Sequence, residues 1–152
     1  MRSEVRILMV IAALSAFVAI HAQTGSSAAE QEFLMSVNRA RQSQGLSALR
    51  WNEALATAAR KHAAIMAQHG SAEHGFPGEP SLSSRVMQSG VHFVWLSENV
   101  ILGSDVAAIE AEFLRSPKHR ANILDPDMDT IGVGVVERGG QLFVVEDFAK
   151  VK

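Results

Sequence analysis

The sequence predicts a single α+β domain in which helices cover both faces of a β-sheet. Apolar residues recur at helical spacing in two long segments of the N-terminal half, whereas residues 131–148 alternate as two strands joined at Gly139-Gly140. Both faces of this hairpin are apolar, because Val133, Val135, Leu142 and Val144 alternate with Val136, Phe143 and Val145. A strand pair that is apolar on both faces is best explained by helices packed on each side of it.

Residues 1–22 have the features of a secretory signal peptide. Arg2 and Arg6 precede an uncharged apolar run over residues 7–20, and small residues suit cleavage after Ala22. The run is shorter than the about 20 apolar residues that a membrane span needs, although an uncleaved anchor is the alternative. We therefore expect a linker over residues 23–29, a domain over residues 30–150, and a secreted or periplasmic protein.

Charge and cysteine content exclude several classes of function. Loss of the signal peptide leaves 12 basic and 15 acidic side chains, a net charge of −3, so no basic excess is available to bind nucleic acid. The chain has no cysteine, which excludes disulfides, thiol nucleophiles and thiolate metal sites. Any metal ligands must come from His, Asp or Glu.

Two helices are expected before the central loop. The first begins near Glu30 and ends at Gly45, and residues 46–51 form an apolar connector that lies on the core. Asn52 is a favourable N-cap for the second helix, and Gly70 follows its last residue.

The second helix carries two histidines on its inner face. This face consists of Leu55, Ala59, His62, Met66 and His69. We expect His62 to be a core histidine whose ring nitrogens are satisfied by backbone or water, rather than a ligand. The position of His69 near the helix end is explained by the macrodipole, which favours a partly charged imidazole there.

A Gly-, Pro- and Ser-rich loop over residues 71–84 contains His74. A short helix over residues 84–90 and a strand over residues 91–96 are expected to follow it. Glu98 then comes directly after the strand, so a carboxylate is expected at a strand end.

The next helix is expected to be capped by Ser104, with Asp105 in its first turn. A second, short helix follows, with Ser116 as N-cap and Pro117 at its first position. His119 would then lie in a fixed first turn, which suits a metal ligand or a general base. The alternative is a surface histidine on a capped turn.

Several motifs occur in one order along residues 30–148. They are Asn38-x-x-Arg41, Leu46-x-x-Leu49-x-Trp51-Asn52-x-x-Leu55-x-x-Ala58, His74, Ser97-Glu98-Asn99, Ser116-Pro117-x-His119-Arg120-x-Asn122-Ile123-Leu124 and Ile131-Gly132-Val133-Gly134. The chain thereby resembles the CAP family of cysteine-rich secretory, antigen 5 and pathogenesis-related proteins, and above all its short cysteine-free bacterial branch. The resemblance implies a three-layer α-β-α sandwich with a central antiparallel sheet and a surface cleft.

In many members of that family the cleft holds two histidines and two acidic residues, and the histidines can take up a divalent metal. The resemblance assigns His74 and His119 as the metal pair and Glu98 as the first acid. The position of the second acid is Ser116 here, which departs from the four-residue pattern. Glu112 lies one helical turn earlier and could reach the same face.

The implied chemistry is a modest metal site. Two neutral imidazoles can bind Zn²⁺, but a tight structural site has four protein ligands, so affinity should be modest and dependent on pH. Glu98 could orient a metal-bound water or act as a general base, or could simply fix its loop. Asn99 and Ser116 are expected to line the cleft with Glu112.

Two functions follow from the resemblance. The first is a monomeric extracytoplasmic binding module without catalysis, which recognises a lipid, a cell-envelope component or a partner protein. The second is a metal-assisted hydrolase of peptides or cell-envelope polymer that uses His74, His119 and Glu98. The departure at Ser116 weakens the second function, because one carboxylate would have to do the work of two.

Overall fold

A computed structural model describes residues 26–152 of the chain. The signal peptide expected over residues 1–22 and the first part of the linker lie outside these residues. The described elements are α1 (Ala28–Ser43), β1 (Arg50–Trp51), α2 (Glu53–His69), α3 (Leu82–Gln88), β2 (Phe93–Gly103), α4 (Val106–Arg115), α5 (Pro117–Ile123), β3 (Thr130–Arg138) and β4 (Gln141–Val151). None of the helices in this part of the chain is both long and apolar enough to span a membrane.

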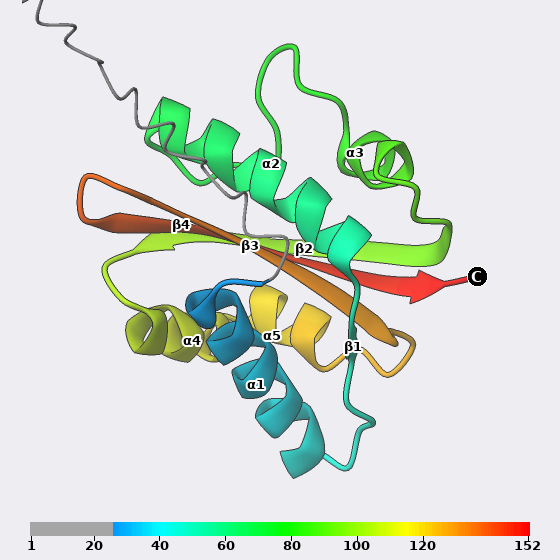
Figure 1. The fold of residues 1–152 in the computed structure, drawn as a ribbon. Coiled ribbons are helices and arrows are strands. Elements are labelled where there is room, and N and C mark those ends of the chain that lie inside the picture. The colour runs from blue at the N-terminus through cyan, green and yellow to red at the C-terminus, as the bar shows by residue number, and fades with distance from the viewer. Residues whose placement is uncertain (1–25) are drawn as a thin grey trace, which may run out of the picture.

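The elements form three layers, with the sheet in the middle (Figure 1). The strand order is β1-β3-β4-β2, and the three long strands pair in antiparallel fashion. Helices α2 and α3 lie on one face of the sheet, and α1, α4 and α5 lie on the other (Figure 1). The expected α-β-α sandwich is therefore confirmed. One addition is β1, which was expected as a connector and pairs in parallel with β3 through Arg50 and Trp51.

The β3–β4 hairpin is buried on both faces, as its two-sided apolar pattern predicts. Val133 and Val144 pack in one cluster with residues from α1, α4 and α5. Phe143 and Val145 pack on the opposite face against α2. Burial of both faces accounts for the near-continuous apolar composition of these strands.

Two glycines of β3 allow α2 to lie directly on the sheet. A Cβ atom at Gly132 would lie 2.5 Å from the carbonyl carbon of Leu55, and one at Gly134 would lie 2.6 Å from the carbonyl oxygen of Ala59. Glycine is thus required at both positions by the close approach of the two backbones. The position of α2 matters for function because this helix supports the loop that carries His74.

Arg41 ties α1 to the segment that follows α5. Its side chain is fully buried, and its guanidinium donates to backbone carbonyls of Ser47, Ile123, Asp125 and Met128. An arginine guanidinium has five N–H donors in one plane, so a single side chain can satisfy several carbonyls at once. These four carbonyls lie in loops or at the end of α5, where no backbone N–H of a helix or strand binds them.

Several predicted element boundaries differ from those observed. Asp105, not Ser104, caps α4, because its carboxylate accepts from the Ala108 backbone N–H. Ser116 precedes Pro117 as expected, but its hydroxyl makes no capping hydrogen bond. Strand β2 extends through Glu98 to Gly103, because every residue from Trp95 onward pairs with β4. Glu98 therefore lies in the middle of a strand, and its expected place at a strand end is wrong.

Candidate functional site

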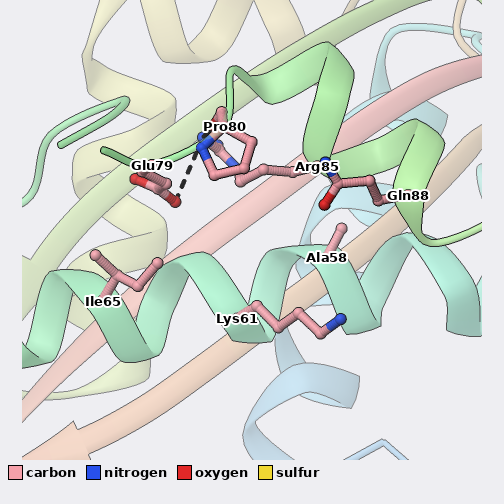
Figure 2. Close-up of a pocket in the computed structure, with 7 residues that line it drawn as sticks. All are labelled: Ala58, Lys61, Ile65, Glu79, Pro80, Arg85 and Gln88. Atoms are coloured by element: carbon pink, nitrogen blue, oxygen red, sulfur yellow. Dashed lines mark hydrogen bonds and ion pairs between the residues drawn. The ribbon is translucent and has the colours of Figure 1, made fainter. Parts of the chain in front are cut away.

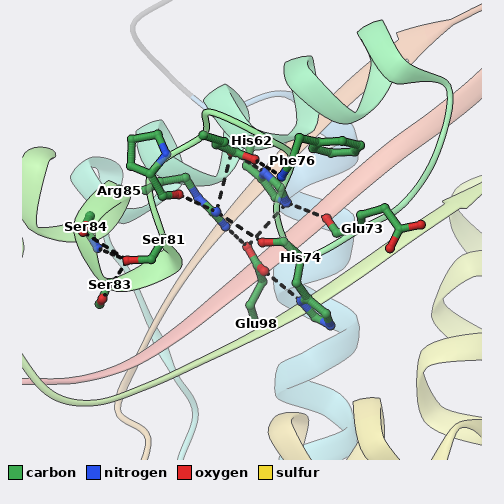
Figure 3. Close-up of polar contacts among 11 residues, drawn as sticks. His62, Glu73, His74, Phe76, Ser81, Ser83, Ser84, Arg85 and Glu98 are labelled. Carbon is green, nitrogen blue, oxygen red and sulfur yellow. Dashed lines mark hydrogen bonds and ion pairs between the residues drawn. The ribbon is translucent and has the colours of Figure 1, made fainter.

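Glu98 is the buried centre of the candidate site. Its side chain is 1% exposed and lies on the face of β2 that looks toward α2 and α3. Arg85 Nη2 donates to its Oε2 at 2.5 Å, and His74 Nδ1 donates to its Oε1 at 2.9 Å. Both carboxylate oxygens are therefore engaged, as Figure 3 shows.

His74 stands above Glu98 in the loop of residues 70–81 that joins α2 to α3. Its side chain is 66% exposed. Because the carboxylate accepts from Nδ1, the neutral ring carries its proton there and leaves Nε2 as the basic nitrogen. A carboxylate behind a histidine fixes the ring and raises its basicity as a ligand. The contact with Glu98 thus leaves Nε2 of the exposed His74 ring as the nitrogen that is open to a ligand.

His119 is the third residue of α5, as the sequence predicts. Its ring packs edge-on against Phe113 with 5.1 Å between ring centroids, and its Nδ1 is buried without a hydrogen-bond partner. Burial and then the positive charge of His74 lower the pKa of His119, and the charge of Glu112 partly opposes this. The imidazole is therefore neutral near pH 7, which is the form that coordinates metal.

His74 and His119 alone would be an incomplete ligand set for a metal ion. Within residues 26–152, no group of three or more His, Asp or Glu side chains is arranged to hold a metal ion. Glu98 cannot become a third ligand without losing Arg85 or His74. Two imidazoles completed by water fit a weakly bound divalent cation and do not fit a closed structural zinc site.

The other residues expected at the cleft have different places. Asn99 is fully buried on the opposite face of β2, so its expected position in the cleft lining is wrong. Its amide donates to the His119 carbonyl and to Glu146, while its oxygen accepts from Asn122. Asn99 therefore anchors α5, and with it His119, to the sheet. Glu112 is half-exposed and pairs with Arg115, and Ser116 is partly buried.

A cluster of buried polar residues lies beneath the His74 loop. His62 of α2 is fully buried, with Nδ1 at 2.6 Å from Glu79 Oε1 and Nε2 at 2.8 Å from the Glu73 carbonyl oxygen. Arg85 of α3 donates to the carbonyls of His74 and Pro80 as well as to Glu98. The expectation that His62 is a satisfied core histidine is confirmed, although one of its partners is a carboxylate.

Asp147 completes the charged cluster from β4. It lies directly across from Glu98 in the sheet and is 1% exposed. Burial, together with the neighbouring charge of Glu98, raises the pKa of Asp147 well above its ordinary value. Arg85 also lies close to two acidic side chains, with Nη2 at 2.5 Å from Glu98 Oε2 and Nη1 at 3.5 Å from Glu79 Oε1.

No local pattern in the sequence marks Glu79 and Arg85 as members of the site. Both lie in irregular or short segments where a charged residue is expected to be exposed, and their burial depends on contacts 13 to 17 residues away along the chain. His62 was visible on the inner face of its helix. His69, placed on the same face by spacing, is instead exposed and stacks on Phe76 with 4.2 Å between ring centroids.

A small cavity lies on the other side of this cluster, between α2 and α3. Its volume is about 120 Å³. Figure 2 shows the residues that line it: Ala58, Lys61, Ile65, Glu79, Pro80, Arg85 and Gln88. Neither candidate metal ligand contributes to its wall, so the cavity is separate from the surface that carries His74.

The sequence model of the cysteine-rich secretory protein (CAP) family matches residues 34–148. The chain is also 31% identical over 119 residues to the uncharacterized protein YkwD of Bacillus subtilis, and the match covers 78% of this chain and 46% of YkwD. The chain thus spans about half the length of that relative.

Two solved structures share the fold. An extracellular SCP-domain protein of Bacillus anthracis has a TM-score of 0.75 at 27% identity, over 80% of this chain and 40% of that one. An outer surface protein of Borrelia burgdorferi has a TM-score of 0.75 at 19% identity, over 82% of this chain and 93% of that one. These two structures show a shared fold, and the match of the family model over residues 34–148 shows that the chain belongs to the CAP family of cysteine-rich secretory proteins.

Proposed function

We propose that this chain is an extracytoplasmic binding module without catalytic activity, and that His74 and His119 take up a divalent cation weakly at its surface. The cation and the surface around it would recognise a lipid or a cell-envelope component. The absence of catalysis is supported by one observation, which is that Glu98 is buried and has both carboxylate oxygens bound.

A general base must reach the proton of an attacking water. Glu98 is 1% exposed, and its two oxygens are bound by Arg85 and His74. Arg85 is paired with this carboxylate at 2.5 Å, so the oxygen that it contacts is already engaged. No second carboxylate occupies the family position, because Ser116 stands there and Glu112 pairs with Arg115. This arrangement supports binding rather than hydrolysis.

The metal part of the proposal depends on the two imidazoles. Glu98 orients His74, while Asn99 and Phe113 hold α5 and the ring of His119. Each ring is thus held by its neighbours, so less conformational entropy would be lost when the ring binds a cation. A cation with two protein ligands keeps open positions for water or for an oxygen of the recognised molecule.

The extracytoplasmic location in this proposal is supported by a feature of the sequence and by two related proteins. Residues 1–22 have the composition of a signal peptide. The related Bacillus anthracis and Borrelia burgdorferi proteins are described as extracellular and outer-surface proteins.

A single set of incubations tests binding against hydrolysis. The purified chain, supplied with Zn²⁺, is incubated with lipid vesicles, with insoluble cell-envelope polymer and with a broad peptide mixture. We expect retention on the vesicles or on the polymer and no new products. Products that form in the wild type, disappear in Glu98→Gln and persist in the exposed control Glu137→Gln would establish the hydrolase instead.

A further inference from the structure

The loop of residues 70–81 lacks regular secondary structure and yet places His74 over Glu98. Most of its residues are exposed, and it packs few apolar side chains into the core. Its position must therefore depend on the polar contacts beneath it. These contacts converge on His62, which reaches the loop from α2 (Figure 3).

The hydrogen bonds of His62 determine where its protons lie. Nε2 faces the carbonyl oxygen of Glu73, which only accepts, so Nε2 must carry a proton. Nδ1 faces Glu79 Oε1 at 2.6 Å. That second contact holds one further proton, either on the imidazole or on the carboxyl group.

The surroundings favour an ionised Glu79. The backbone N–H of Phe76 donates to Glu79 Oε2 at 3.2 Å, and Arg85 Nη1 lies 3.5 Å from Oε1. Both groups stabilise a carboxylate rather than a carboxylic acid. Glu98 Oε2, at 3.9 Å from His62 Nε2, adds a negative charge that favours a protonated imidazole.

The charges of the buried cluster then balance. His62 and Arg85 supply two positive charges, and Glu79 and Glu98 supply two negative charges. Burial raises the pKa of Asp147, which favours its uncharged form. Buried charges are tolerated when they are paired and hydrogen-bonded in this way.

We propose that His62 is a positioning residue, held as an imidazolium, which binds Glu79 and the Glu73 carbonyl and thereby fixes the loop that presents His74. The histidine links α2 to the loop on both sides of His74, at positions 73 and 79. Its role is distinct from that of a metal ligand, because it lies fully buried beneath the loop. Only the effect on metal affinity rests on the proposed function.

The first test is ¹⁵N NMR of the imidazole rings in the full chain near pH 7. The expected result is that both nitrogens of His62 have protonated-type shifts, the signature of an imidazolium. An unprotonated-type Nδ1 would overturn the proposal. This measurement requires no variant and does not depend on metal.

The second test is hydrogen exchange of the loop in a double-mutant cycle. His62→Gln removes the cation at 2.6 Å from Glu79 and leaves it only Arg85 at 3.5 Å, and Glu79→Gln leaves the buried imidazolium without its bonded carboxylate. Each should therefore speed exchange in residues 71–80 by about 10-fold or more. The pair His62→Gln with Glu79→Gln removes both charges and should recover most of the protection. If the double variant were no better protected than the worse single variant, the ion-pair role would be contradicted. His92→Gln, which changes an exposed histidine, is the matched control.

The same variants separate this proposal from the metal site. If the wild type binds Zn²⁺, His62→Gln should weaken binding by about 10-fold, as loss of an outer-shell residue commonly does. If the wild type binds no Zn²⁺, the metal part of the proposed function fails, while the NMR and exchange results still decide the role of His62. Where a variant does not fold, the wild-type NMR result decides alone.

Discussion

Arg85 donates a hydrogen bond to Glu98 at 2.5 Å, and this contact neutralises a buried carboxylate directly beneath the exposed His74. The contact joins α3 to the middle of β2 and determines what the site can do chemically. It pairs the buried carboxylate with a cation through Oε2, while Oε1 accepts from the ring of His74.

Removal of this cation should strongly destabilise the fold. Arg85→Met leaves Glu98 buried and without its cation, and the expected loss of unfolding free energy is about 3–5 kcal/mol. Denaturant unfolding measures this loss. Arg115→Met is the control, because Arg115 pairs with Glu112 at the surface and its loss should cost at most about 0.5 kcal/mol. Equal effects of the two substitutions would contradict the assigned role of Arg85.

The pKa of His119 should respond to two neighbours in opposite directions. NMR titration of the wild type should give a midpoint below 6.5, because burial and the charge of His74 both disfavour the imidazolium. His74→Gln should raise this midpoint, and Glu112→Gln should lower it, because Glu112 favours the charged form. A midpoint unchanged in both variants would show that the two residues do not act on His119.

Glu146 should make the fold less stable as the pH rises. Burial raises the pKa of Glu146 to about 8, against an ordinary value of 4.5, so the folded chain holds a proton that the unfolded chain releases. The stability associated with this proton is complete below pH 4.5 and is lost as the pH rises through about 8. The slope is about 1.4 kcal/mol per pH unit within that window.

Glu146→Gln should remove this slope while it retains an acceptor for Asn99. The expected observation is that the variant gains stability relative to the wild type between pH 5 and about 8. Glu137→Gln, at an exposed position, should follow the wild type. If the wild type and Glu146→Gln had parallel stability profiles, Glu146 would be ionised in the fold.

The close approach of α2 to β3 should make Gly132 intolerant of a methyl group. In Gly132→Ala the new Cβ would lie 2.5 Å from the Leu55 carbonyl carbon, so backbone must move. We expect a loss of about 3 kcal/mol or more in the free energy of unfolding. Gly75→Ala places its Cβ in open space and should change stability by at most about 0.5 kcal/mol. A tolerated Gly132→Ala would mean that α2 does not lie directly on the sheet.

Local patterns predicted the parts of the fold that depend on local physics. The limits of α2 follow from Asn52 and Gly70, which cap its two ends as expected. The hairpin follows from alternation around Gly139-Gly140, and the place of His119 in a first turn follows from Pro117. In each case the residues that decide the structure are neighbours in sequence.

Features that depend on distant partners were not predictable in this way. Strand β1 has two residues, too few for any periodicity, and exists because β3 pairs with it. The polar residues Ser97, Glu98 and Asn99 interrupt the apolar pattern of β2, yet β4 pairs with all three. Glu98 and Asn99 are buried against Arg85 and Asn122, whose contacts with them are visible only once the chain has folded.

The proposed metal site stays a prediction, and only the contacts around its residues can be compared with the sequence analysis. The resemblance selected His74, Glu98 and His119, and the structure places Glu98 against His74. The resemblance could not show that Arg85 contacts Glu98 or that His62 contacts Glu79 of the loop, because both interactions join residues far apart in sequence. The proposed role of the site as a binding surface follows from these added contacts.

Calorimetric titration of the purified chain with Zn²⁺ at pH 7 tests the proposed metal site most directly. We predict saturable one-site binding of modest affinity, lost in His74→Gln and in His119→Gln and retained in the exposed control His69→Gln. Lowering the pH toward 5.5 should weaken the binding, because protonated imidazoles do not coordinate metal. Absence of binding in the wild type, or equal binding in all four proteins, would contradict the claim that His74 and His119 form a metal site.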